Sequence, residues 1–444
     1  PEEFDVAAHH ALARRAAEQC IVLLENDGIL PLAPEVRVAV VGEFARTPRY
    51  QGAGSSRVNP TRIENALDAI SAIVGYDVPF APGFVTAAGQ ELSESAREDA
   101  VAVARDAEVV LAFLGLGENH ESEGYDRETL DLPTEQLELL DELLAVNPNV
   151  VVVLSNGSSV LVSPFAGRAR AIVEGWLLGQ AGGAAIADVL FGVVNPSGKL
   201  AETVPLRLED VPSFLHFPGD ADGVRYGEGL FVGYRGYDAT RTAVAYPFGH
   251  GLSYTSFEYS ELSVTATDTG LLVSVQVTNT GARAGREVVQ AYVGLPGSPV
   301  VRAPRELKGF TDVTLEPGAG TQVEIVIAAD ELAYYSVRDA AWLIEAGSYL
   351  VEVGSSSRDL RAGATVELAG NEPQRPLTLA STVGEALAVP QFAAVVADLV
   401  QGLFEGDADL LRMLEGMPLA VVAGFTGLST AEFGELLDSV NGQR

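Results

Sequence analysis

The chain reads Val109-Val110-Leu111-Ala112-Phe113-Leu114-Gly115, a short run without a charged or polar side chain. Such a run is typical of a strand that is buried on both faces of a parallel sheet. Similar runs lie at residues 36–42, 150–155 and 171–176, and helix-like segments lie at about residues 5–26, 61–74, 91–106, 134–146 and 183–191. Strands that alternate with helices predict a layered α/β domain over residues 1–215. Ligands of such domains bind beyond the carboxyl ends of the strands.

The segment that follows this run is unusually rich in charge. It reads Gly117-Glu118-Asn119-His120-Glu121-Ser122-Glu123-Gly124-Tyr125-Asp126-Arg127. Carboxylates this close repel one another, which raises the pKa of at least one of them toward neutrality. Arg127 and His120 can keep their neighbours ionised, so the segment favours an acid/base site. The alternative is a solvated acidic loop in a very acidic protein.

A second loop follows the first predicted strand and reads Tyr50-Gln51-Gly52-Ala53-Gly54-Ser55-Ser56-Arg57-Val58. Its glycine spacing is a weak signal for phosphate binding, because it has neither the third glycine of a dinucleotide fingerprint nor the Gly-Lys-Ser/Thr ending of a P-loop. A tight polar loop that approaches a ligand, or a simple turn, is the better interpretation.

Length and charge limit the classes of partner. A chain of 444 residues is too long for one ordinary core and indicates two or three domains. The 28 Lys and Arg residues against 61 Asp and Glu residues leave a formal net charge of −33. Nucleic acid and anionic membranes are therefore poor partners, and neutral or cationic ligands fit better. No run of 18 apolar residues that could span a bilayer is present.

No metal or organic cofactor is implied. The single cysteine, Cys20, excludes an intrachain disulfide framework and a thiolate zinc cluster, and its place on the apolar phase of a helix predicts a packed thiol. His9 and His10 lie on an expected exposed helix phase without metal-ligand spacing. His250, in a turn, is interpreted as a packed or hydrogen-bonded histidine.

The second half of the chain has a different pattern. Residues 216–258 are expected to link the domains. Residues 259–370 alternate apolar and polar positions, with strands expected at 262–278, 287–293, 321–327, 342–344 and 348–353, and predict a β-sandwich. Residues 371–444 predict a short helical tail, with helices at 392–404, 407–414 and 430–440, that needs a larger body to pack against. The absence of an initiating methionine predicts a fragment or a processed subunit.

Several longer motifs occur in a fixed order. They lie at residues 22–32, 121–127 with 130–133, 182–192, 195–200, 226–235 and 246–254, and further motifs lie at 279–281, 285–290 and 304–310. Through the first set, the chain resembles the non-barrel part of a glycoside hydrolase family 3 β-glucosidase. Through the second set, the β-sandwich resembles the fibronectin type III-like domain of the same family. The resemblance covers residues 1 to about 368.

The resemblance implies retaining hydrolysis of a β-glycoside by two carboxylates, one acting as nucleophile and the other as general acid/base. The acid/base is then Glu123, and Glu121 is the rival candidate. Asp126 and Arg127 are expected to form an ion pair inside the loop that orients Glu123. Further residues are candidates for contact with the substrate on the leaving-group side: Ser55, Ser56, Arg57, His120 and Tyr125.

The chain departs from the family in one respect. The family's nucleophilic aspartate lies in a Ser-Asp-Trp-like motif on a (β/α) barrel, and the chain has neither that motif nor the barrel's units. We therefore expect this chain to be inactive alone, with a partner barrel in the same parent chain or in a separate chain. The side of the α/β domain that faces the barrel is expected to be apolar and partly exposed.

Glucosides are the default substrate implied by the resemblance, and xylosides, galactosides and arabinosides remain open. Two functions of other classes also remain open. One is a non-catalytic carbohydrate-binding module, and the other is a scaffold that supports a homo-oligomer through its β-sandwich.

Overall fold

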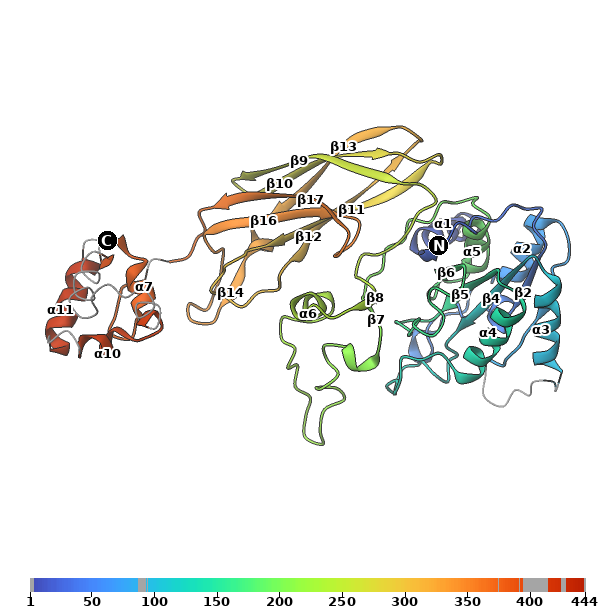
Figure 1. Cartoon of the computed structure of the whole chain (residues 1–444), viewed down its shortest axis with the longest axis horizontal. Helices are drawn as coiled ribbons and strands as arrows, with labels where there is room; N and C mark the ends of the chain where they lie inside the picture. The colour runs from blue at the N-terminus through green and yellow to red at the C-terminus, as the bar shows by residue number, and fades with distance from the viewer. Residues whose placement is uncertain are drawn as a thin grey trace. The chain divides into compact units, whose positions relative to one another are not determined.

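The apolar runs form the centre of a six-stranded sheet in the computed structural model (Figure 1). The strands follow the order β1-β6-β5-β4-β2-β3, and those from β2 to β6 run parallel. They are β2 (Val38–Val41), β3 (Phe80–Ala81), β4 (Val109–Gly115), β5 (Val150–Ser155) and β6 (Ala171–Glu174). Every residue of β2, β4, β5 and β6 is buried, as the continuous apolar runs predict.

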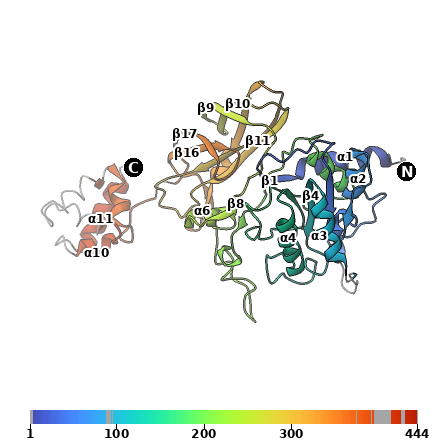
Figure 2. The same cartoon turned by 45° about the vertical axis from the view of Figure 1, so that its right-hand side comes forward.

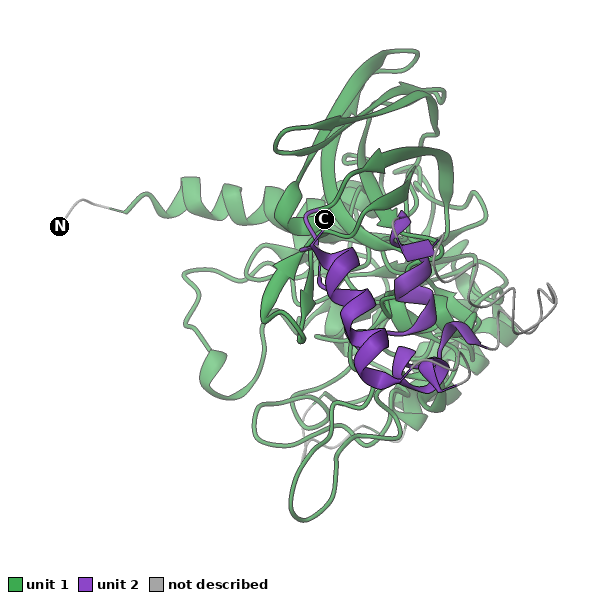
Figure 3. Ribbon diagram, turned by 90° about the vertical axis from the view of Figure 1, so that its left-hand side faces the viewer, with its two compact units in different colours: residues 1–370 green, residues 371–444 purple. Residues whose placement is uncertain are grey.

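The structure describes residues 4–86, 93, 95–373, 375–390, 392–393, 414–424 and 429–442. They divide into two units, residues 1–370 and 371–444, which Figure 3 colours separately. Within the described residues, no helix is long and apolar enough to cross a membrane.

The helix expected over residues 5–26 is shorter. Helix α1 (Val6–Cys20) ends where Ile21 becomes extended, and β1 (Val22–Asn26) pairs antiparallel with β6. Pairing with a distant strand overrides the helical pattern of these residues. The expected packing of Cys20 is wrong, because this thiol is exposed.

The helices lie on both faces of the sheet. Helices α1, α2 (Ala66–Val74) and α5 (Gly182–Leu190) pack together, and α3 (Ala96–Asp106) packs with α4 (Thr134–Val146) on the opposite face (Figures 1 and 2). The neighbouring strands β2 and β4 are therefore followed by helices on opposite faces, α2 after β2 and α4 after β4. Such a change of direction opens a crevice at the carboxyl ends of the two strands.

Two histidines have packing roles. His10 of α1 is buried, contrary to the exposed phase expected for it, with Nδ1 2.7 Å from Gln180 and Nε2 3.1 Å from Glu64. His250 has Nε2 2.9 Å from the Leu24 carbonyl, and its ring stacks on Tyr246. The hydrogen-bonded role expected for His250 is confirmed.

The segment between the sheet domain and the sandwich has little regular structure. It contains β7 (Val204–Pro205), the 3-10 turn η3 (Leu208–Asp210), α6 (Tyr234–Thr240) and β8 (Val244–Tyr246). Its large apolar side chains are unusually exposed, among them Leu215, Tyr226 and Leu230, at 86%, 82% and 65%. On the α/β domain itself, Val58 and Tyr125 are exposed at 65% and 50%.

The sandwich has a three-stranded sheet in the order β13-β10-β9 and a four-stranded sheet in the order β12-β11-β16-β17. The strands are β9 (Phe257–Thr267), β10 (Gly270–Asn279), β11 (Gly285–Gly294), β12 (Glu306–Leu315), β13 (Gly320–Ala328), β16 (Gly347–Gly354) and β17 (Leu360–Leu368). A small hairpin of β14 (Tyr334–Ser336) and β15 (Ala341–Leu343) follows the 3-10 turn η4 (Ala329–Leu332). The single strand expected at 262–278 is wrong, because a tight turn at Asp268 and Thr269 divides it into β9 and β10.

Buried charge joins the sandwich to the α/β domain. Lys199 donates to the Gly251 carbonyl at 2.8 Å and lies 3.5 Å from the Glu287 carboxylate of β11. Tyr259 of β9 donates to the same carboxylate at 3.0 Å. Burial lowers the pKa of Lys199, although Glu287 opposes this effect.

Residues 371–444 have a hydrophobic cluster of their own, built around Phe392 and Phe433. The described helices are α7 (Val383–Leu387), α10 (Leu419–Ala423) and α11 (Thr430–Asn441). Ser429 and Glu432 form a capping box that starts α11, near the expected helix at 430–440. Most of the helices expected at 392–404 and 407–414 lies outside the described residues. The expected packing of this tail against a larger body stays a prediction.

Candidate active site

Two loops meet at the crevice between the carboxyl ends of β2 and β4. The first runs from β2 through the 3-10 turns η1 (Glu43–Ala45) and η2 (Gly54–Ser56), and the second is the acidic loop after β4. The sheet therefore brings the two loops that the sequence singles out to the same edge.

Glu123 is exposed and lies against η2. Its Oε2 accepts the amide N–H of Ser55 at 2.6 Å. Hydrogen bonds from Ser55 stabilise the ionised form, so they lower the pKa of Glu123. The rise in pKa expected from crowding is therefore wrong for this carboxyl group.

Gly54 allows this close approach. It has a φ of +77°, and a Cβ at this position would lie 2.6 Å from Glu123 Oε2 and 2.7 Å from Glu123 Cβ. A side chain here would be strained by the backbone and would also displace the glutamate.

The two loops are tied together by an ion pair. Arg57 pairs with Glu118, and both side chains are about half exposed. Tyr125 donates its hydroxyl to the Glu118 carbonyl at 2.6 Å, while His120 is exposed at the tip of the loop. Ser56 donates to the Ala53 carbonyl at 3.2 Å within η2. Of the candidate contact residues, Ser55 thus contacts Glu123 directly, while Arg57 and Tyr125 contact Glu118 of the same loop.

Glu121 points the other way. Its Oε2 accepts the Gly157 amide at 2.7 Å, and its Oε1 accepts the Ser158 hydroxyl at 2.9 Å. These donors belong to the loop after β5, so Glu121 anchors the acidic loop to the neighbouring strand. With both carboxylate oxygens bonded inward, Glu121 is poorly placed to meet a ligand from outside.

Arg127 does not pair with Asp126, so the ion pair expected between them is wrong. Its guanidinium donates to Ser158 Oγ at 2.9 Å and to the Ser159 carbonyl at 3.0 Å, and lies 4.0 Å from Glu121. Asp126 is exposed. Arg127 therefore reinforces the anchor that Glu121 makes.

Arg49 is a further anchor that the sequence interpretation missed. Its buried guanidinium donates to the carbonyls of Gln51, Leu116 and Glu121 at 2.9, 3.0 and 3.0 Å. One side chain thus binds the backbone of both loops. An arginine in a glycine-rich loop after a buried strand is the signal that could have indicated this role.

Two further carboxyl groups, the buried Glu174 and the partly buried Glu202, lie near the acidic loop, and the sequence interpretation missed both. Glu174 accepts the Trp176 amide at 2.8 Å and the Asn156 side-chain amide at 3.1 Å, and burial raises its pKa to about 8. Glu202 accepts the Ser159 amide at 2.8 Å, and burial raises its pKa as well. A glutamate inside the otherwise apolar run at 171–176 is a signal for such a buried group.

Among the described residues, no group of three or more His, Cys, Asp or Glu side chains is arranged to hold a metal ion. The chemistry that the edge offers is that of an exposed carboxylate held by the backbone amide of Ser55. Such a group can exchange a proton with a bound molecule.

Comparisons with known proteins agree with this architecture. The Glycosyl hydrolase family 3 C-terminal domain matches residues 21–254, and the Fibronectin type III-like domain matches residues 287–357. The chain is 46% identical to an exo-α-(1→6)-L-arabinopyranosidase of Bifidobacterium breve, covering 97% of this chain and 59% of that protein. It is 39% identical to thermostable β-glucosidase B of Acetivibrio thermocellus, covering 99% of this chain and 60% of the relative.

A solved structure is also similar. The crystal structure of a family 3 β-glucosidase of Bifidobacterium adolescentis superposes with a TM-score of 0.84 at 49% identity, over 89% of this chain and 58% of that one. The chain thus spans about three fifths of the length of the relatives it matches. The predicted fold class, an α/β domain followed by a fibronectin type III-like sandwich and a helical tail, is confirmed. The chain belongs to glycosyl hydrolase family 3 and carries the C-terminal domain of that family.

Proposed function

We propose that this chain supplies the general acid/base, Glu123, of a retaining β-glucosidase whose nucleophilic aspartate lies on a barrel outside these 444 residues. The observation that carries the proposal is the contrast between two glutamates of one loop. Glu123 presents an exposed carboxylate at the carboxyl edge of the sheet, while Glu121 is bonded inward. This contrast favours Glu123 over its rival.

The proposed chemistry needs Glu123 in two protonation states. It donates a proton to the leaving oxygen, and then removes one from the water that releases the sugar. The hydrogen bonds from Ser55 favour the ionised state that the second step uses. The first step requires a higher pKa, so docking of the barrel must bury Glu123 or weaken the Ser55 contact.

The neighbouring side chains have supporting roles in this proposal. Ser55, Ser56, Arg57, His120 and Tyr125 line the leaving-group side of the site. Glu121, Arg127 and Arg49 position the acidic loop through the contacts described above. The partner is the barrel, in the same parent chain or in a separate chain.

β-Glucosides are the proposed substrates, because two of the similar proteins are described as β-glucosidases. A second candidate is an α-L-arabinopyranoside, which the description of the Bifidobacterium breve relative favours. β-Xylosides are a further alternative. Comparing kcat/KM for the three p-nitrophenyl glycosides, with the barrel present, decides among them.

The acid/base role is tested by Glu123→Gln in the barrel-containing protein. We expect turnover of alkyl β-glucosides to fall by about 10²–10⁴-fold, the usual contribution of a general acid. Activated aryl glycosides should lose much less in the first step, because their leaving groups need little protonation. Glu128→Gln, an exposed change in the same loop, is the matched control. The assignment of the acid/base would pass to Glu121 if Glu123→Gln stayed active while Glu121→Gln lost far more activity on alkyl than on aryl glycosides.

A separate test asks whether this chain needs the barrel for hydrolysis. The 444-residue chain alone should not hydrolyse an aryl β-glucoside, and addition of the barrel chain should restore turnover. Clear turnover by the chain alone contradicts the proposal. Sugar binding that survives Glu123→Gln without any effect on turnover would favour a carbohydrate-binding module, and no sugar binding at all would favour a scaffold.

A further inference from the structure

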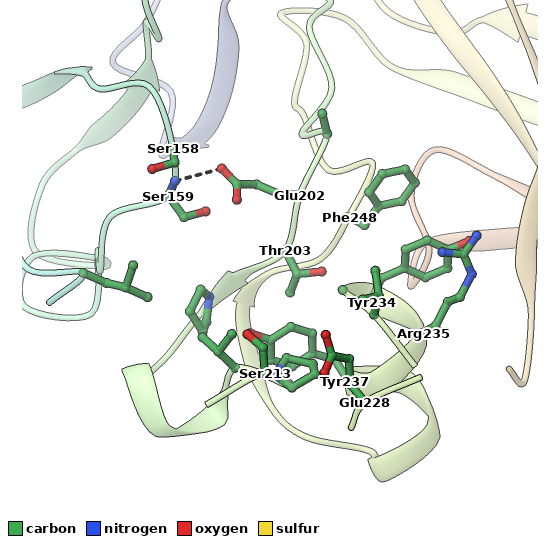
Figure 4. Close-up of a pocket in the computed structure, with 17 residues that line it drawn as sticks. Ser158, Ser159, Glu202, Thr203, Ser213, Glu228, Tyr234, Arg235, Tyr237 and Phe248 are labelled. Carbon is green, nitrogen blue, oxygen red and sulfur yellow. Dashed lines mark hydrogen bonds between the residues drawn. The ribbon is translucent and has the colours of Figure 1, made fainter. Parts of the chain in front are cut away.

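A cavity of about 390 Å³ lies between the loop after β5 and the segment that follows residue 200 (Figure 4). Ser158 and Ser159 form one wall, and Glu202, Thr203, Glu228 and Tyr237 form the others. Glu123 and η2 are not among the residues that line it. Its volume falls within the range of about 300–1,000 Å³ that small-molecule sites occupy.

Three polar atoms of this cavity lack a partner. Ser159 Oγ, Thr203 Oγ1 and Glu228 Oε2 are buried and have no hydrogen bond to any residue that the structure describes. Buried polar atoms are nearly always satisfied by protein, water or a ligand. Their presence around one cavity indicates that a polar molecule occupies it.

The charges of the lining decide which kind of molecule fits. Glu202 and Glu228 supply carboxylates, and the second oxygen of Glu202 is not used by the Ser159 amide. The cation of the lining, Arg235, is already engaged, because its Nε donates to Glu306 at 3.1 Å and its guanidinium stacks over Tyr234. The cavity therefore rejects anions and requires an occupant that donates hydrogen bonds.

Hydroxyl and apolar groups complete the lining. Burial raises the pKa of Tyr237 to about 12, so its hydroxyl stays protonated and can donate as well as accept. Apolar walls come from Leu130, Pro205, Val211, Pro212, Val232 and Phe248. This combination of carboxylates, hydroxyls and apolar surface matches a pyranose ring, which has hydroxyl edges and C–H faces.

We propose that the cavity bounded by Ser159, Thr203 and Glu228 is a second binding site, for a neutral sugar of monosaccharide size. The sugar hydroxyls donate to the two carboxylates and exchange hydrogen bonds with Ser159 and Thr203. The lining residues alone support this site, which does not depend on the proposed hydrolase activity.

The test is titration calorimetry with D-glucose on the full 444-residue chain. We expect saturable binding that weakens about tenfold or more in Thr203→Val and in Glu228→Gln, since each change removes one hydrogen-bonding group. Thr314→Val, at an exposed position of β12, and Glu123→Gln should bind as the unchanged chain does. Circular dichroism identifies any variant that fails to fold. A crystal of the unchanged chain soaked in D-glucose should show the sugar against Thr203 and Glu228.

Several outcomes overturn the proposal. They are absence of glucose binding at millimolar concentrations, binding that is lost in Glu123→Gln but intact in Thr203→Val, and a soaked crystal in which the cavity holds water alone. Displacement of glucose by methylammonium chloride would show that the site takes a cation instead. Displacement by sodium sulfate would contradict the charge argument. Because binding is measured without turnover, failure here leaves the acid/base assignment untouched.

Discussion

Replacing Glu174 with glutamine should change how stability depends on pH. The carboxyl group is only 3% exposed at the end of β6, and its neighbours Glu202 and Glu121 add repulsion to the effect of burial. A pKa of about 8, against an ordinary value of 4.5, means that the folded chain holds a proton which the unfolded chain releases. Folding stability should therefore be highest below the ordinary value and should fall as pH rises toward 8.

The magnitude follows from the two pKa values. Each pKa unit corresponds to about 1.4 kcal/mol, so the whole loss is at most about 5 kcal/mol. Glutamine has nearly the same shape and cannot ionise, so Glu174→Gln should avoid this loss. The variant should be close to the unchanged chain in stability at pH 5, and more stable by several kcal/mol at pH 9.

Urea unfolding at pH 5, 7 and 9 provides the assay, with tryptophan fluorescence as the signal. The chain has two tryptophans, and Trp176 donates its amide to Glu174. A Trp342→Phe background, at an exposed position of β15, leaves Trp176 as the reporter. Glu345→Gln is the control, because that buried carboxylate pairs with Arg302 at 3.1 Å and its loss should destabilise the sandwich. A stability difference between Glu174→Gln and the unchanged chain that stays the same from pH 5 to pH 9 would refute the reasoning.

Three further predictions concern the two loops. Gly54→Ala should lower the free energy of unfolding by about 1 kcal/mol and abolish most turnover in the barrel-containing protein, because the new side chain displaces Glu123. The control is Gly75→Ala, at φ +76° in open space, which should give a similar loss of stability and full activity. Melting curves and kcat/KM for both variants check this, and equal activities would contradict it. Glu121→Gln should cost about 1–2 kcal/mol, seen as a lower urea midpoint, because one inward hydrogen bond is lost; an unchanged midpoint would argue against the anchor. Arg49→Met should lower the free energy of unfolding by about 3 kcal/mol, since three backbone carbonyls lose their donor. Arg49→Lys should restore only part of this loss.

The sheet is predictable from the sequence because its strands are continuous apolar runs. The predicted range of α4, residues 134–146, coincides with the observed helix, whose Leu139 and Leu143 form its buried stripe. β1 is not predictable in the same way. Its residues continue the helical pattern of α1, and only the backbone of β6, about 150 positions later, makes them a strand.

The same contrast between local sequence patterns and long-range partners holds for the candidate site. The two loops can be recognised because each follows an apolar strand and carries local charge or glycine. Partners at long range cannot be recognised, because no local pattern links Arg49 to the Leu116 carbonyl or Glu121 to Ser158. The expected Asp126–Arg127 pair illustrates this limit, since adjacent residues in a loop point in different directions.

The ion pair between Lys199 and Glu287 affects how the protein unfolds. Because the ammonium group is buried where the α/β domain meets β11, separating the two modules would break this ion pair and expose to water the surface that now covers it. We expect the modules to melt as a single cooperative block, so that a truncation after residue 258 would weaken even the parallel sheet that it leaves intact.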